Sequence, residues 1–248
     1  MPGPVLFARY AYPPNALGYC GPDDPAGLLR MGADGRAVDE LARLASRFDG
    51  AWPYLELIAG CNGIADPLDR RVVEAYWVGN ELLDRVPAAT LMSWLSEHFW
   101  RPAGPMVSPA MTAVPHHSLH VFAVYPWLGL LRAGAEVPAL RVLDRCRIRW
   151  GRVAAVRGDM VAVRERPLCF AGSRLGLGPA RLGWARGSAD GVGFAGPLSP
   201  GDMVSLHWDW VCDRLTPGAL RWLVACTARN LRAVNGSPRP GPAGGSVS

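Results

Sequence analysis

The chain has 248 residues, half of them hydrophobic, which is enough for one large domain or two small ones with buried cores. Its formal net charge is +5, from 26 basic residues that are all arginine and 21 acidic residues. The high apolar content excludes a disordered chain. Because the arginines are scattered among Asp and Glu and form no stripe with aromatic residues, we expect no nucleic-acid partner.

Targeting signals also narrow the function classes. No apolar run reaches the roughly 18 residues that cross a bilayer, and the N-terminal residues show no basic region followed by an apolar core. We therefore expect no membrane partner and a cytoplasmic location. The six cysteines lie far apart, and no Cys-x-x-Cys pair suggests a disulfide framework or a zinc knuckle; they are Cys20, Cys61, Cys146, Cys169, Cys212 and Cys226.

The first half of the chain has helical periodicity. Residues 1–21 are rich in Pro, Gly and Tyr and predict an extended, turning segment. Asp24-Pro25 then predicts a helix start, with Gly32 as its end. Further helices are predicted over residues 36–48, 68–86, 88–100 and 117–132, the last of them kinked or ended by Pro126, with a long loop over 101–115.

The hydrophobic period changes from helical to about two near residues 143–145. Residues 146–157 and 160–166 predict a β-hairpin around Gly158-Asp159, and residues 203–212 predict a further strand. Thr216-Pro217 opens a final helix. The pattern predicts an α+β protein: a helical domain at 1–143, a small β-barrel with a C-terminal helix at 144–235, and a disordered tail at 236–248.

Two motifs in the second domain resemble a known family. Cys146-Arg-Ile-Arg-Trp-Gly-Arg-Val matches a strand that Cys leads and that ends in Gly, a basic residue and Val. Pro200-Gly-Asp-Met-Val-Ser-Leu-His207 matches a second strand, and Leu215-Thr-Pro217 opens a helix at the same point as in the family. This third of the chain resembles the HypC-type chaperones of nickel–iron hydrogenase maturation.

The resemblance implies an OB-like barrel with an accessory, non-catalytic function. Such chaperones carry an iron fragment with cyanide and CO ligands from a HypD-type iron–sulfur scaffold protein to the hydrogenase large-subunit precursor. The family's two iron ligands carry over to Cys146 and His207, and a thiolate with a neutral imidazole suits low-spin iron. We also expect Arg145 and Arg147 to favour the thiolate of a partly exposed Cys146.

The helical domain offers weaker candidates for a site. His116 and His120 are four residues apart and, with His117, could bind a metal on one helix face, although capping and packing also explain them. Cys61, in a turn before the Asp66 helix, could have its pKa lowered by the helix dipole, or be an ordinary turn cysteine.

Two alternative functions follow from these candidates. One is a metal- or thiol-dependent enzyme with its site in the helical domain. The other is a scaffold protein without a metal. No phosphate-binding glycine loop and no Gly-x-Ser-x-Gly motif is found, so we expect no nucleotide cofactor and no serine hydrolase of that type.

Overall fold

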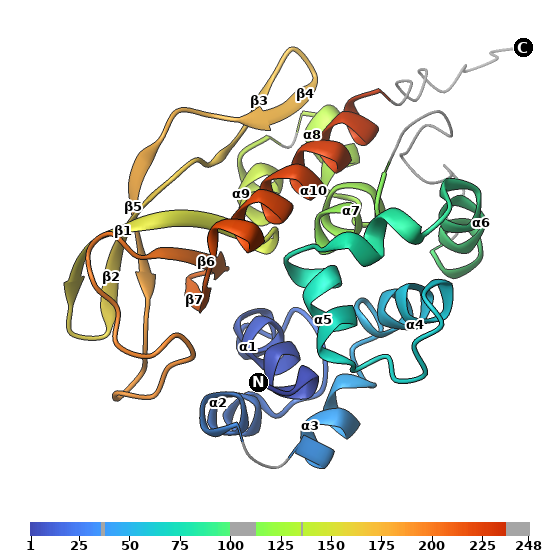
Figure 1. The fold of residues 1–248 in the computed structure, drawn as a ribbon. Coiled ribbons are helices and arrows are strands. Elements are labelled where there is room, and N and C mark those ends of the chain that lie inside the picture. Colours follow the sequence, from blue (N-terminus) through green and yellow to red (C-terminus); the bar gives the residue numbers. More distant parts are fainter. Residues whose placement is uncertain (36–37, 100–112, 135, 237–248) are drawn as a thin grey trace, which may run out of the picture.

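A helical region packs against one side of a β-barrel, and a C-terminal helix lies beside both (Figure 1). The computed structural model describes residues 1–35, 38–99, 113–134 and 136–236. The predicted α+β class and the order of its parts are confirmed. Most of the predicted loop at 101–115, and the predicted tail from residue 237 onward, lie outside the described residues.

The first element is a helix, so the prediction of an extended N-terminal segment is wrong. Helix α1 (Gly3–Ala16) has Pro4 in its first turn and Pro13 and Pro14 in its last. These two late prolines remove two helical hydrogen bonds. Nearly every residue of α1 is buried, because helices and barrel strands surround it, and this burial offsets the missing bonds.

The next helices form the outer part of the helical region. Asp24 caps α2 as predicted, accepting a hydrogen bond from the Gly27 amide at 3.0 Å. The helix runs past Gly32 and ends at Gly35, which adopts a left-handed conformation with φ of 67°. The elements up to residue 98 are α2 (Pro25–Asp34), α3 (Val38–Ala45), α4 (Trp52–Cys61), α5 (Arg70–Trp77), the 3-10 helix η1 (Glu81–Arg85) and α6 (Ala88–His98).

The predicted helix over 117–132 is interrupted at Pro126, as expected. It consists of α7 (His117–Leu119), the π-helical turn η2 (His120–Val124) and, after Pro126, α8 (Trp127–Arg132). Helix α9 (Glu136–Cys146) leads into the barrel. Cys146 is therefore the last residue of a helix and not the first of a strand, since β1 begins three residues later at Arg149.

Five strands close into a barrel in the order β1-β2-β5-β7-β6. Neighbours are antiparallel except for β5 and β7, and this arrangement is of the OB type that the resemblance implies. The predicted strand at 203–212 is in fact two strands joined by a tight turn at Trp208-Asp209. The barrel strands are β1 (Arg149–Arg157), β2 (Met160–Glu165), β5 (Arg181–Arg186), β6 (Met203–His207) and β7 (Trp210–Arg214), and β3 (Leu168–Ala171) and β4 (Arg174–Leu177) form a separate hairpin.

The glycine of the first family-like motif has a packing reason. A Cβ on Gly151 would lie 2.5 Å from Val163 Cγ1 and 2.6 Å from the Arg164 carbonyl oxygen of the neighbouring strand. Only glycine allows β1 and β2 to approach so closely here.

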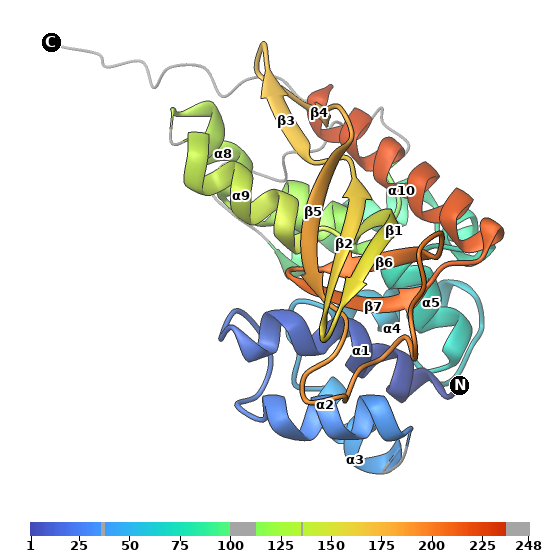
Figure 2. The same ribbon diagram turned by 90° about the vertical axis from the view of Figure 1, so that its left-hand side faces the viewer.

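The barrel has its own small core, but its outer face on the helical side belongs to the main core of the protein. Trp210 and Cys212 of β7 pack in the same apolar cluster as the helical region. Helix α10 (Pro217–Asn235), capped by Thr216 as predicted, packs against α7 and β4, and Figure 2 shows β4 beside one end of α10. No helix among the described residues is long and apolar enough to cross a membrane.

A buried ion pair joins β1 to β2. Arg149 and Glu165 are 2 % and 4 % exposed, and the guanidinium donates to the carboxylate and to the Trp208 carbonyl oxygen. Glu165→Ala leaves a buried charge unpaired and should lower the free energy of unfolding in urea by about 3–5 kcal/mol. Glu40→Ala, which removes an exposed pair with Arg43, should cost under about 1 kcal/mol. Equal losses in the two variants would contradict this role for Glu165.

Candidate metal site

His207 is held in place by a carbonyl group that helix α1 leaves free. In a regular helix the amide of residue 14 would donate to the Tyr10 carbonyl oxygen, but Pro14 has no amide hydrogen. The Tyr10 oxygen instead accepts a hydrogen bond of 2.7 Å from His207 Nδ1. The side chain of Tyr10 reinforces this contact, because its hydroxyl lies 2.8 Å from Ser205 Oγ on the same strand, β6.

This hydrogen bond determines which nitrogen of His207 can bind a ligand. A carbonyl oxygen only accepts, so Nδ1 carries the proton and the neutral ring has its lone pair on Nε2. Nε2 is buried and has no hydrogen-bond partner among the described residues. Burial, followed by the nearby His117, holds the pKa of His207 well below its ordinary value. The ring is thus a neutral donor with an available lone pair.

His117 is oriented in a similar way. Its Nε2 donates to the Cys146 carbonyl oxygen at 2.9 Å, so the neutral ring keeps its lone pair on Nδ1. The hydroxyl of Tyr76 lies 3.1 Å from this Nδ1 and 3.3 Å from the Gly50 carbonyl oxygen. The Tyr76 hydroxyl has one proton, which can go either to His117 Nδ1 or to the Gly50 carbonyl oxygen. If a cation bound Nδ1, the hydroxyl would still donate to Gly50.

Cys146 completes the cluster. Its thiol is buried, and burial raises its pKa, with a further contribution from Cys20. A bound cation offsets that cost, since a coordinating thiol is deprotonated by the metal.

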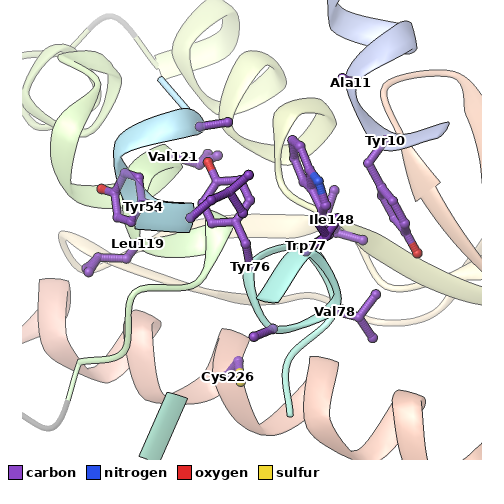
Figure 3. Close-up of a cluster of buried hydrophobic side chains, with 14 of the residues drawn as sticks. Tyr10, Ala11, Tyr54, Tyr76, Trp77, Val78, Leu119, Val121, Ile148 and Cys226 are labelled. Carbon is purple, nitrogen blue, oxygen red and sulfur yellow. The ribbon is translucent and has the colours of Figure 1, made fainter. Parts of the chain in front are cut away.

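One ligand atom from each of His117, Cys146 and His207 lies within 4.8 Å of the others. They line a largely apolar cavity of about 200 Å³ between the helical region and the barrel. Aromatic rings, among them Tyr76 and Trp77, form much of its wall. Figure 3 shows Trp77 between Tyr76 and Tyr10, whose buried ring lies behind the wall. Two imidazoles and a thiolate with open positions suit a transition metal such as iron or zinc.

The structure thus brings together the two residues that the motifs indicated, Cys146 and His207, and adds one of the weaker candidates, His117. His116 and His120 do not join the cluster, and His116 instead agrees with the capping alternative. His116 caps α7 by accepting from the Ser118 amide at 3.1 Å, and its Nε2 lies 3.1 Å from the Trp77 carbonyl oxygen. Burial and the neighbouring His117 lower its pKa to about 3.

His120 lines the cavity without joining the cluster. Its ring packs edge-on against Tyr54 and Tyr125, with centroid distances of 5.5 Å and 4.6 Å. Its structural role is to form part of the cavity wall.

The expectation that neighbouring arginines favour the Cys146 thiolate is wrong, and of the two alternatives for Cys61 the lowered pKa is not found. Cys61 is the last residue of α4, at the negative end of the helix dipole, and burial raises its pKa. Beside Cys146, Arg145 pairs with Asp209, and Arg147 pairs with Asp144 at 3.0 Å. Neither arginine is therefore free to stabilise the thiolate.

Other residues of the cavity carried no signal in the sequence. Cys20 lines it, and burial raises the pKa of its thiol to about 12. Trp208 and Tyr19 line it as well. No spacing rule points to these residues, because they lie in turns and reach the cavity only through the packing of α1 against the barrel.

The protein thus combines an OB-type barrel with a helical region, and a buried His–Cys–His cluster lies where the two parts meet. The chain belongs to a family of unknown function (DUF6390), which matches residues 1–240 and so includes both parts. No curated protein and no solved structure matches the chain significantly.

The buried histidines should make the metal-free protein sensitive to acid. Burial lowers the pKa of His117 to about 4, whereas an unfolded histidine titrates near 6.5. The unfolded chain therefore binds more protons below pH 6.5, and the folded state loses stability as the pH falls from 6.5 toward 4.

Urea unfolding in the presence of a chelator checks this. The free energy of unfolding should fall by roughly 1.4 kcal/mol per pH unit per buried histidine between pH 6.5 and pH 5. In His116→Gln the free energy of unfolding should fall by roughly 1.4 kcal/mol less per pH unit than in the wild type, because one buried histidine is gone. A free energy that does not change from pH 7 to pH 5 would contradict the neutral, buried state of these rings.

Proposed function

We propose that this protein is a maturation factor for a nickel–iron hydrogenase, and that it holds an iron fragment with cyanide and CO ligands as its cargo. The observation that carries this proposal is the convergence of Cys146 and His207, the two ligand positions of the family-like motifs, in one buried cluster.

The architecture of the barrel supports the resemblance. The strand order is of the OB type, and Gly151 of the first motif is required where β1 and β2 approach. The second motif forms β6, which ends at His207, and α10 follows the barrel. The second motif and α10 therefore lie at the elements that the resemblance implies, whereas Cys146 of the first motif ends α9 and does not lead a strand.

The donor set suits such a cargo. A thiolate and neutral imidazoles are adequate ligands for low-spin iron, and they leave other positions for diatomic ligands. A water molecule takes about 30 Å³ of liquid volume, so a cavity of about 200 Å³ has room for a metal ion and a few diatomic groups. The apolar wall also shields the ligands from water.

The third ligand gives the helical region a function. His117 comes from α7, and its position depends on the carbonyl group of Cys146 at the end of α9. Residues 1–143 contain only one member of the cluster, His117. An enzyme whose metal lies in the helical region alone is therefore disfavoured. We propose the HypD-type scaffold protein as the source of the cargo and the hydrogenase large-subunit precursor as its acceptor.

The test is to co-express the full chain with the hydrogenase assembly proteins, purify it, and measure iron content together with infrared absorption in the cyanide and CO region. The wild type should carry iron with both kinds of band. Cys146→Ser and His207→Gln should each reduce bound iron at least tenfold, because each removes a ligand.

The matched control is Cys169→Ser, a partly buried cysteine on β3 that does not line the cavity. It should keep wild-type iron and bands. Full iron loading and hydrogenase activity in a Cys146→Ala, His207→Ala double variant would overturn the proposal, as would iron without cyanide or CO bands in the wild type.

A further inference from the structure

A second hollow, of about 590 Å³, lies directly outside the metal cavity. The two spaces share three wall residues, Tyr19, Val142 and Trp208. The outer hollow is otherwise lined by more polar groups, among them Arg141 and Arg145 of α9. A ligand that crosses this shared wall moves from a polar surface into the apolar cavity.

Two stacked aromatic rings form much of the shared wall. The rings of Tyr19 and Trp208 are nearly parallel, 4.3 Å apart with an interplanar angle of 21°. Tyr19 is 53 % exposed and lies between Gly18 and Gly21, both of which have positive φ. About half of the side chain faces solvent, and its backbone lies in a turn, so the ring can rotate away from Trp208 without unfolding a helix or strand.

Trp208 is the fixed member of the pair. Its amide donates to the Arg145 carbonyl oxygen at 2.8 Å, and its own carbonyl oxygen accepts from the buried Arg149. The Trp208 residue adopts a positive φ of 50°, which the turn between β6 and β7 imposes. Movement of Tyr19, and not of Trp208, therefore opens the wall.

The indole of Trp208 also lies against the Cys146 thiol. Its Nε1 is buried and has no hydrogen-bond partner among the described residues. An indole N–H in this position can donate to the sulfur once the sulfur carries charge.

The charge at the outer hollow is positive. Arg141 and Arg145 are four residues apart on α9 and lie on one face of the helix. Arg145 is neutralised by Asp209, whereas Arg141 is exposed and makes no ion pair within the described parts of the chain. The hollow therefore keeps an excess positive charge on Arg141, next to the aromatic wall.

We infer that this hollow is the entrance to the metal cavity, that Tyr19 closes it against Trp208, and that Arg141 makes it selective for anions. The ligand class is a small anion or a metal bound in an anionic complex; a bare divalent cation is disfavoured. The inference rests on the proposed function only for the identity of the cargo, since the entrance is defined by Tyr19, Trp208 and Arg141 themselves.

The entrance can be tested without iron or a partner, by alkylation of Cys146 in the full chain. Iodoacetate and iodoacetamide have similar sizes but differ by one negative charge. In both reactions the sulfur bonds to the reagent's CH₂ carbon, iodide leaves, and the thiol proton goes to solvent. The ratio of the two rates cancels any change in thiol pKa. All variants carry Cys20→Ser, which removes the other cysteine of the cavity. Mass spectrometry measures alkylation of Cys146, and a small free thiol gives the intrinsic rate ratio of the two reagents.

Opposite changes are expected from variants at the hollow. Arg141→Glu should lower the iodoacetate-to-iodoacetamide ratio at least threefold, and Asp209→Asn should raise it, because each changes the local charge. Both effects should shrink in 1 M salt. Tyr19→Ala should raise both rates several-fold with an unchanged ratio. The control Arg221→Glu, an exposed position on α10 away from the hollow, should change neither rate.

Two outcomes would overturn the inference. One is the same ratio in Arg141→Glu as in Arg221→Glu; the other is unchanged rates in Tyr19→Ala. Neither involves iron. A chain without cyanide and CO bands but with charge-selective alkylation would therefore reject the proposed cargo and keep the entrance, and the reverse result would reject only the entrance.

Discussion

The free carbonyl group of Tyr10 is the constraint on which the rest of the site depends. Pro14 cannot donate to it, and the buried oxygen must find another partner, because an unsatisfied polar group costs about 1–3 kcal/mol. That partner is His207 on the barrel. The hydrogen bond from His207 to this oxygen thus joins β6 to α1. It also fixes the tautomer of a candidate metal ligand and holds the helical region against the barrel. The stack of Tyr10 on Trp77 extends the contact toward α5.

Because both parts of the chain contribute to the cluster, the candidate site exists only when the helical region and the barrel are packed together. His207 belongs to the barrel, His117 to the helical region, and Cys146 to the helix that connects them. His117 in turn donates a hydrogen bond to the carbonyl oxygen of Cys146, the last residue of that helix. A movement of the barrel against the helices would therefore separate the three side chains.

Burial decides the chemistry of the cluster as much as residue identity does. In the absence of a metal the low-dielectric surroundings keep the two imidazoles and the thiol neutral, so the site holds no charge of its own. A cation supplies the charge that makes the thiolate favourable. The charged groups nearby are already paired, as Arg147 with Asp144 shows, and the excess positive charge lies farther out at Arg141.

The sequence by itself determined what depends on local pattern. The β-hairpin, the caps at Asp24 and Thr216 and the interruption at Pro126 were accessible from local pattern, and only the resemblance to a known family connected Cys146 with His207. Tertiary structure decided the rest. It makes the proline-rich segment of α1 a helix, because burial there outweighs the lost hydrogen bonds. It selects His117 over its neighbours and raises the pKa of Cys146, because position and desolvation come from residues far apart in the chain.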